Sequence, residues 1–385
     1  MKKENTSLSS ISVASLSSLL FGLGLTSFEI TEKISAASEH KGLSTIAIAN
    51  VFLGGVVGAI ILEFYKGGGP KKLIIVSSML NLLGYIFILV CPKIQCILIA
   101  RIIIGVGNGL SGLTVPYYIF ELSPTSYKGL LSSLHPMNIN LGIVIGQALS
   151  KFNTEALWIF GIGIIGVLSF ISLSMSLFIV NLAKKETKGK TIIDLIRKPE
   201  AFKSTKIVLI LHLAQHLSGI DYVVVFLGRI LKDTYSPFYY TLGIMSLSIP
   251  ANIVCSVLLD RYGRKPLMVM SCSLITISCL LLTFCGRPEF SIVLFVVGYN
   301  LGLSNVPWLV PNELAPSEYI APLSSLGVQV NWLSAFFVVQ IFIRITESLK
   351  DKTWLIYGGL MAAISLFTLV FVPETKGKEG YDFVK

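Results

Sequence analysis

The chain has 385 residues, of which 53% are hydrophobic and only 14% are charged, and its mean hydropathy is +0.77. A soluble domain carries about 25% charged residues, so this composition excludes an ordinary soluble protein. Basic loops beside membrane helices explain the formal net charge of +10 better than nucleic-acid binding does. The sequence has no catalytic triad, paired-carboxylate site or metal-ligand spacing. We therefore predict that the protein is not an enzyme and binds no metal or cofactor.

Twelve apolar segments are long enough to cross a bilayer, which takes about 20 residues per helix. They lie at about 10–29, 43–64, 71–91, 95–119, 130–150, 156–181, 206–229, 237–259, 266–285, 288–311, 322–344 and 353–372. This pattern predicts an all-α membrane protein with two bundles of six helices, residues 1–181 and 206–385. The polar, basic stretch 182–205 between them is predicted to be a cytosolic linker.

The placement of basic residues predicts the orientation of these spans. Lys2 and Lys3 precede the first apolar run, which lacks a clear cleavage site and is interpreted as a span rather than a signal peptide. With the N-terminus in the cytosol, 20 of the 31 Lys and Arg residues fall on the cytosolic side and 10 outside. Because basic residues accumulate in cytosolic loops, we expect a multi-pass plasma-membrane protein with both termini in the cytosol.

The two halves of the chain repeat one another. ELSP at 121–124 returns as ELAP at 313–316, 192 residues later, and 9 of 21 residues are identical between 121–141 and 313–333. A chain that repeats at half its length is built from two copies of one unit. Together with the membrane-length segments, the repeat predicts a transporter whose substrate site lies between the halves, near the bilayer midplane.

Two local patterns admit more than one interpretation. Gly161, Gly163 and Gly166 spell the dinucleotide fingerprint GxGxxG, but they lie inside an apolar span without a preceding strand. We expect them to serve helix packing through small residues. Cys91 and Cys96 flank a short loop and could pair, but we expect free thiols.

Charged residues gather at the ends of the fourth, eighth and tenth spans. The sequence DRYGRKP at 260–266 joins two spans through a glycine turn. We predict a cytosolic latch, which forms in one conformation and breaks in another. Its expected members are Glu121, Lys128, Asp260, Arg261, Arg264 and Glu313. The alternative is that the basic loop only anchors the helices at the membrane surface.

A set of motifs in chain order resembles one known family. The motifs are RIIIGVGNG (101–109), PYYIFELSP (116–124), QHLSGID (215–221), DRYGRK (260–265), PW (307–308), NW (331–332) and PETKG (373–377). Together they resemble the sugar porter family of the major facilitator superfamily. The resemblance runs from about residue 95 to the C-terminus. It implies the twelve-helix fold, alternating access and a small hexose-like substrate such as glucose.

Several polar and aromatic residues of the second half are predicted to bind this substrate. Amides both donate to and accept from hydroxyl groups, and an aromatic ring covers the apolar face of a sugar. The expected site residues are Gln215, His216, Asp221, Asn300, Trp308, Asn331 and Trp332. The alternative for each amide is a bond between helices, and Trp332 could be a packing residue.

The sequence departs from the family pattern at positions that concern the substrate. Pro136 stands where the family has a sugar-binding glutamine in the fifth span, and Asn138 or Asn140 could compensate. His216 replaces the second glutamine of the seventh-span motif, and Asp221 replaces its asparagine. The substrate could therefore differ from glucose.

Energy coupling is predicted from the first span. The resemblance implies that proton-coupled members carry an aspartate there, within a sequence like FGYD. This chain has FGLG at 21–24, so Arg101 lacks that partner. We therefore favour facilitative uniport. The alternative is a proton symporter that uses Asp221, with His216 five residues earlier as a possible relay partner.

A non-transporting sugar sensor and a drug antiporter are further alternatives. A monomer is sufficient for transport, and bilayer lipid is the other expected partner.

Overall fold

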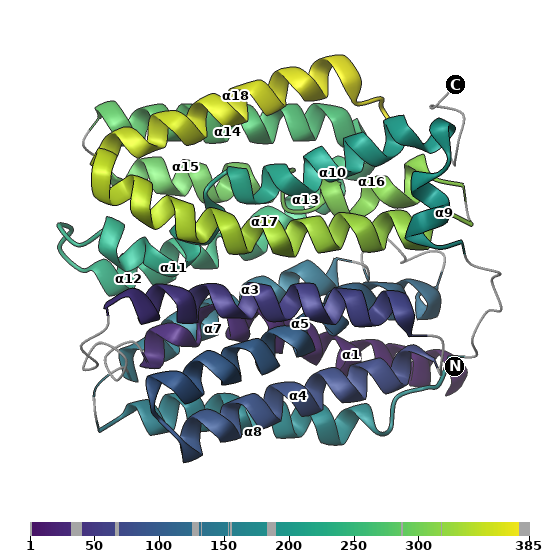
Figure 1. Cartoon of the computed structure of the whole chain (residues 1–385), viewed down its shortest axis with the longest axis horizontal. Helices are drawn as coiled ribbons and strands as arrows, with labels where there is room; N and C mark the ends of the chain where they lie inside the picture. The colour runs from purple at the N-terminus through teal and green to yellow at the C-terminus, as the bar shows by residue number, and fades with distance from the viewer. Residues whose placement is uncertain are drawn as a thin grey trace. The chain divides into compact units, whose positions relative to one another are not determined.

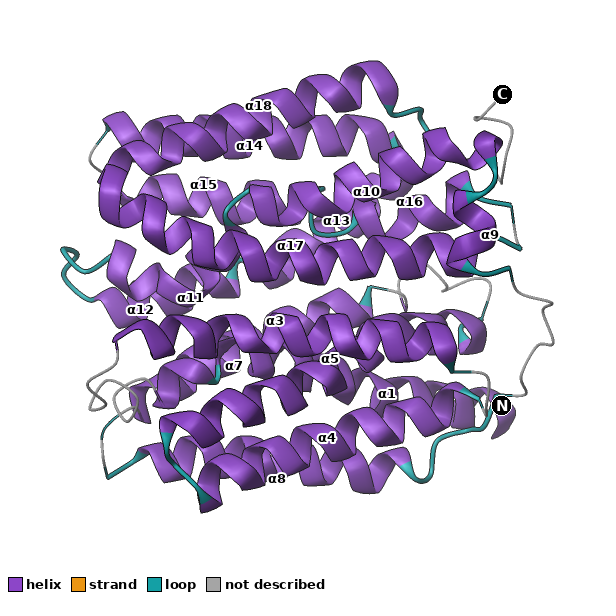
Figure 2. Cartoon of the chain, in the orientation of Figure 1, coloured by secondary structure: helices purple, strands orange, loops and turns teal. Residues whose placement is uncertain are grey.

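The structure is a computed structural model that describes residues 2–31, 41–65, 69–124, 131, 133–152, 154, 156–182, 190–285, 288–316 and 318–376. Within these ranges every regular element is a helix (Figure 2). Helices satisfy their backbone hydrogen bonds internally, which is what a segment in lipid requires. The chain divides into two compact units, Met1–Lys185 and Glu186–Lys385 (Figure 1).

The N-terminal unit contains one long helix for each of its six predicted spans. These helices are α1 (Lys2–Thr26), α3 (Lys41–Phe64), α4 (Pro70–Val90), α5 (Ile94–Leu122), α7 (Leu134–Leu149) and α8 (Trp158–Ser176). Helix α5 packs on α1, α3 and α4, and α1 also packs on α7. Helix α1 also contacts α8, so α1 and α5 together connect the six helices of this unit.

Glycines let α3 and α5 approach very closely. A Cβ atom at Gly105 would lie 2.1 Å from the carbonyl oxygen of Val51, and one at Gly109 would lie 2.3 Å from that of Gly55. Real Cβ atoms do not come this near a backbone oxygen, so these positions exclude any side chain. The glycine run of α5 thus serves helix-to-helix packing, which is a common use of small residues in membrane helices.

The glycines of α8 behave differently from the expectation. At Gly161 a Cβ would lie 2.8 Å from the Ile30 side chain, which agrees with a packing role. At Gly163 and Gly166 a Cβ would meet nothing within 4 Å among the described residues. The close-packing interpretation is therefore wrong for these two, because each position has room for a Cβ, although Gly166 is itself buried.

The C-terminal unit differs because three of its six predicted spans consist of two helices each. Its helices are α10 (Phe202–Leu217), α11 (Ile220–Ile230), α12 (Pro237–Ser246), α13 (Ser248–Tyr262), α14 (Arg264–Phe284), α15 (Pro288–Asn300), α16 (Val306–Leu314), α17 (Ile320–Leu349) and α18 (Thr353–Phe371). Between α10 and α11 the chain turns at Gly219, whose φ of +88° favours glycine. Between α15 and α16 the residues 301–305 form turns instead of helix.

The hydropathy of the observed helices agrees with a membrane protein. Among the described residues, nine helical segments are long and apolar enough to cross a bilayer, and one of them, Ile320–Phe371, joins α17 and α18. Helix α7 has 16 residues and the α15–α16 pair is interrupted, which leaves both below a length of 18. The predicted linker 182–205 contains α9 (Ile192–Ile196), a 3₁₀ turn at Pro199–Ala201 and the start of α10.

The cysteines require one correction. Cys91 and Cys96 form a disulfide, with their Cα atoms 6.0 Å apart, so the expectation of free thiols at these positions is wrong. The reason is local, since α4 ends at Val90 and α5 begins at Ile94. The short connection therefore brings the two cysteines close enough to form a bond.

Candidate substrate site

Gln215 and Asn331 form a buried amide pair at the centre of the C-terminal unit. Gln215 lies near the end of α10, and its Oε1 accepts from Asn331 Nδ2 of α17 at 2.6 Å. Its Nε2 donates to the carbonyl oxygens of Leu303 and Ser304, at 2.8 and 3.3 Å. These carbonyls are available because residues 301–305 are not helical. Gln215 therefore ties the break in α10–α11 to the break in α15–α16.

His216 and Asp221 lie on opposite sides of the Gly219 turn and face each other. Their Nδ1 and Oδ2 atoms are 2.6 Å apart, and the residues are 8% and 9% exposed. The turn explains the contact, because a straight helix would separate positions five apart by about 7.5 Å along its axis. The two residues that depart from the family pattern in this motif, His216 and Asp221, are thus in direct contact with each other.

Asn300 belongs to a second amide network next to the first. Its Oδ1 accepts from Asn252 Nδ2 of α13, and Asn252 Oδ1 in turn accepts from Asn305 Nδ2 at 2.8 Å. Ser304 also donates to Asn252, at 3.5 Å. The network holds the interrupted part of α15–α16, so Asn300 bonds helix to helix in this conformation. Sequence reasoning missed Asn252 and Asn305, although an amide inside an apolar span was a usable signal.

The two predicted tryptophans lie at different depths. Trp308 of α16 is half-buried, and its ring meets the ring of His212 edge-on with centroids 5.2 Å apart. Asn331 Nδ2 donates to the His212 carbonyl oxygen at 3.4 Å, so His212 connects Trp308 to the amide pair. Trp332 of α17 is 3% exposed and is packed inside the unit. Of the two, Trp308 is the ring with a surface left to offer a ligand.

Two of the residues predicted to form a latch, Arg264 and Glu313, are in contact in the C-terminal unit. Arg264, the first residue of α14, binds Glu313 of α16 through Nη2 at 2.7 Å and Nε at 2.9 Å. Arg264 Nη1 also donates to the Leu259 carbonyl at 3.0 Å. This two-point contact fixes the planar guanidinium on the carboxylate. Arg264 and Glu313 thus connect the start of α14 to the end of α16.

Glu374, which follows α18, completes the same cluster and had been given no role. Its carboxylate accepts from the backbone N–H groups of Arg264 at 2.9 Å and Lys265 at 3.0 Å. A Cβ at Gly263, whose φ is +95°, would lie 2.5 Å from that carboxylate. The signal in the sequence was an acid in the PETKG motif, which matches the unpaired N–H groups at the start of a helix.

The environment of Glu374 favours its charged form. Partial burial alone would raise the pKa of this carboxyl. Hydrogen bonds from the backbone N–H groups of Arg264, Lys376, Lys265 and Thr375 outweigh burial and hold the pKa below its usual value. The hydroxyl of Thr375 donates to Glu313. The segment after α18 is therefore bound to the latch by two adjacent side chains.

The remaining predicted latch residues are less directly connected. Asp260 and Arg261 are exposed at the end of α13. The guanidinium of Arg261 lies over the Tyr262 ring, 5.4 Å from its centroid. Glu121 lies in the last turn of α5 in the other unit, and Lys128 falls outside the described residues. The structure thus joins Arg264 and Glu313, and it adds Glu374 and Thr375.

Arg101 is buried in α5 of the N-terminal unit, with 1% exposure. Its guanidinium donates to the carbonyl oxygens of Gly24 and, at 3.1 Å, of Ala47. It also donates to the Ser27 hydroxyl at 3.1 Å and to the Ile48 carbonyl at 3.4 Å. All four acceptors are neutral. Gly24 lies in the last turn of α1, where unpaired carbonyls form the negative end of the helix dipole.

Comparisons with known proteins agree on the family. Residues 13–181 and 179–383 each match the family model described as sugar (and other) transporter. Human facilitated glucose transporter member 3 of solute carrier family 2 is 24% identical over 97% of this chain and 91% of its own length. Facilitated trehalose transporter Tret1 of Anopheles gambiae is 25% identical over 93% of this chain and 51% of its own.

Solved structures give the fold. The proton:xylose symporter XylE with bound 6-bromo-6-deoxy-D-glucose matches with a TM-score of 0.80 at 18% identity, over 97% of this chain and 98% of that one. Inward open XylE from E. coli matches with a TM-score of 0.80 at 20% identity, over 96% and 97% of the two chains. Both are major facilitator proteins by fold. This chain is thus a multi-pass membrane protein with the major facilitator fold, not an enzyme, and belongs to the sugar (and other) transporter family.

Proposed function

We propose that the protein carries a hexose across the membrane by alternating access, as a facilitative uniporter. The observation that carries the proposal is the amide pair of Gln215 and Asn331, placed beside Trp308 and beside the non-helical residues 301–305. Amides and exposed carbonyls supply both donors and acceptors for hydroxyl groups. Trp308 supplies an aromatic face for a sugar ring.

In the present conformation these groups bond to one another. Gln215 donates to Leu303 and Ser304 and accepts from Asn331. A sugar hydroxyl would exchange for one of these bonds, because it donates and accepts in the same way. Substrate binding would therefore loosen the contact between α10 and the 301–305 turn. Such an exchange couples occupancy of the site to the arrangement of two broken helices.

The names of the relatives support a sugar but disagree on its size and on coupling. The human and mosquito proteins are named facilitated transporters of glucose and trehalose, and XylE is named a proton:xylose symporter. We favour uniport because Gly24 occupies the first-span position in question and its carbonyl binds Arg101. Arg101 is therefore held by neutral oxygens instead of by a carboxylate that gains and loses a proton.

One observation favours proton symport as the second candidate. His216 and Asp221 are buried and 2.6 Å apart. Such a pair can hold a proton between an imidazole and a carboxylate. In the uniport account, Asp221 acts as a hydroxyl acceptor and His216 fixes its position. The two accounts differ only in whether the charge of this pair changes during the transport cycle.

We further propose that both termini lie in the cytosol, in the plasma membrane, and that 182–205 is a cytosolic linker between bundles 1–181 and 206–385. The support is the bias of 20 basic residues on the cytosolic side against 10 outside. A protease site inserted at position 190 should be cleaved only from the cytosolic side of sealed vesicles. Cleavage from outside would overturn the orientation.

Uptake of labelled sugars into proteoliposomes tests the substrate. We expect saturable hexose uptake, which unlabelled hexoses inhibit and disaccharides inhibit less. The variant Pro136→Gln restores the family glutamine and should change the order of preference among hexoses. Uptake of organic cations or drugs without any hexose uptake would refute the proposal.

A further inference from the structure

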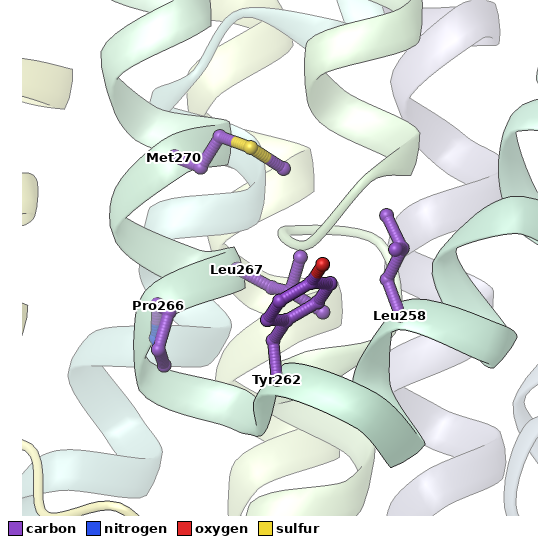
Figure 3. A pocket seen from close by; sticks show the side chains of 5 residues that line it. All are labelled: Leu258, Tyr262, Pro266, Leu267 and Met270. Carbon is purple, nitrogen blue, oxygen red and sulfur yellow. The ribbon is translucent and has the colours of Figure 1, made fainter.

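An apolar groove lies between the end of α13 and the start of α14. It is lined by Leu258, Tyr262, Pro266, Leu267 and Met270 (Figure 3). Its volume is about 250 Å³. In the view of Figure 3 the Tyr262 ring overlaps the Leu267 side chain, and Leu258 lies to one side of them. This volume is smaller than that of pockets for drug-sized ligands, which begin at about 300 Å³, and suits a slender hydrocarbon segment.

The groove is formed by the tight turn that joins the two helices. Gly263 is the single residue between them, with a φ of +95°, so α14 begins directly against the last turn of α13. Tyr262 remains 55% exposed and Met270 36% exposed. The groove is therefore open along one side. None of its lining residues belongs to the substrate site described above.

Two basic residues adjoin lining residues of the groove at the turn between the helices. The guanidinium of Arg261 is 5.4 Å from the centroid of the Tyr262 ring, which itself lines the groove. Lys265 directly precedes Pro266, another lining residue. Within the described part of the chain, no ion pair engages Arg261 or Lys265. Asp260 lowers the local positive charge by one but does not cancel it.

Two neighbouring groups that could bind an anion are already occupied, while Lys376, whose Nζ donates to the Arg261 carbonyl oxygen at 2.9 Å, adds a third cation nearby. Arg264 is held by Glu313 at 2.7 Å. The backbone N–H groups of Arg264 and Lys265, at the start of α14, donate to Glu374. An anion at this end of the groove would therefore be held by the side chains of Arg261 and Lys265, with Lys376 adding to the positive charge.

We propose that this groove binds an anionic phospholipid, with one acyl chain along the five lining residues and the phosphate between Arg261 and Lys265. The apolar lining selects a hydrocarbon chain, and the paired cations select a negative headgroup. A sterol would fill the groove but leave both cations unmatched. A zwitterionic lipid would bring its own positive charge beside them. The proposal is independent of which solute the protein transports.

Lipid retention by the purified full-length chain tests the proposal. The protein is exchanged into detergent with equal amounts of phosphatidylglycerol and phosphatidylcholine that carry the same acyl chains, and bound lipid is counted by native mass spectrometry. We expect phosphatidylglycerol to be retained in preference. Because each basic residue near a membrane surface strengthens such binding about fivefold, Lys265→Gln should weaken retention by about that factor. Equal retention of the two lipids by the wild type would overturn the proposal.

Matched variants distinguish lipid binding in the groove from effects of charge or hydrophobicity elsewhere on the protein. Lys352 is exposed and directly precedes α18, at the end of that helix far from the groove. Lys352→Gln should therefore leave retention unchanged. Met270→Trp fills the groove and should abolish the preference. Ile277→Trp, two turns further along α14 at a position that is 48% exposed, should not. Thermal unfolding shows that each variant is folded. If Met270→Trp retains the wild-type preference in a folded protein, other parts of the chain cover the groove and the proposal fails.

Discussion

The two copies of the repeated element, α5 and the α15–α16 pair, have diverged in structure. With the offset of 192 residues, Gly109 of α5 aligns in sequence with Leu301, the first residue of the interruption in the second copy. In α5 the helix continues unbroken for 29 residues and presses its glycines against α3. In the second copy the helix stops at Asn300 and resumes at Val306, and the interruption binds Gln215.

The difference shows how one sequence unit can serve two purposes. Close glycine packing makes α5 a rigid part of its unit, and the buried charge of Arg101 further ties α5 to α1 and α3. The interruption in α15–α16 frees backbone carbonyls, which bind amides and could bind hydroxyl groups. We therefore expect changes in α5 to affect folding and changes around 301–305 to affect transport.

The largest expected effect comes from a bulky side chain at one of the α5 glycines that pack against α3. Gly109→Leu would place a side chain 2.3 Å from the Gly55 carbonyl, and a packed interior cannot absorb that overlap. We expect little or no folded, monodisperse protein by size-exclusion chromatography. Gly163→Leu in α8, at a position that is not buried and where a Cβ meets nothing within 4 Å, is the control. Normal folding of Gly109→Leu would break the proposed contrast between the two copies.

The next effect concerns the amide pair. Gln215→Ala leaves Asn331 and two carbonyls without their partner, and loss of a buried hydrogen bond costs about 1–3 kcal/mol. We expect sugar affinity to fall by roughly 5- to 150-fold while the protein still reaches the membrane. Trp308→Ala should also weaken uptake. Gln329→Ala, whose partner Ser325 lies in the same helix, should transport normally. Unchanged kinetics for Gln215→Ala and Trp308→Ala would place the site elsewhere.

The third effect concerns the predicted latch. Its acids, Glu121 and Glu313, stand at equivalent positions near the ends of the two copies. Arg264→Gln removes the contact of 2.7 Å to Glu313 without touching the amide pair. We expect exchange of sugar across the membrane to slow severalfold, with equilibrium sugar binding unchanged within twofold. Glu121→Gln should slow exchange as well if both copies carry a latch. Weaker binding with an intact exchange rate would contradict a conformational role for Arg264.

The smallest effect is a pH dependence at Glu374. Because its pKa is lower in the folded protein than its usual value, its contacts stabilise the protein above that usual value and are lost as the pH falls through the folded pKa. The difference in Tm between wild type and Glu374→Gln should therefore stay constant from pH 7 to the usual carboxyl value of 4.5 and shrink as the pH is lowered further, to about pH 3. Glu347→Gln, at an exposed position in α17, is the control. A difference that stays constant over the whole range would refute the assigned cause.

Hydropathy predicted the membrane helices because it depends only on local composition, and lipid imposes a length on every span. It could not predict the interruption at 301–305, since only Ser304 and Asn305 of LGLSN are polar and the span as a whole stays apolar. The amides Gln215 and Asn331 were predicted because polar groups are costly at membrane depth. Their partners were not, because hydrogen bonds between helices depend on how those helices pack.

The same limit applies at the ends of the helices. The contact between Arg264 and Glu313 agrees with the predicted latch, whose role in the cycle stays a prediction. Glu374 was missed because it is separated from Arg264 by 110 positions, and only the fold brings the two together. The disulfide between Cys91 and Cys96 depends on where two helices end, and sequence patterns give such boundaries poorly.

Sugar accumulation under an imposed proton gradient tests the central claim most directly. Proteoliposomes with an inward proton gradient are loaded with labelled hexose until uptake stops, for the wild type and for Asp221→Asn. The uniport account predicts that internal sugar equals external sugar in both, and that Asp221→Asn retains much of the transport with an altered sugar preference. Accumulation by the wild type above the external concentration, lost in Asp221→Asn while exchange persists, would contradict it.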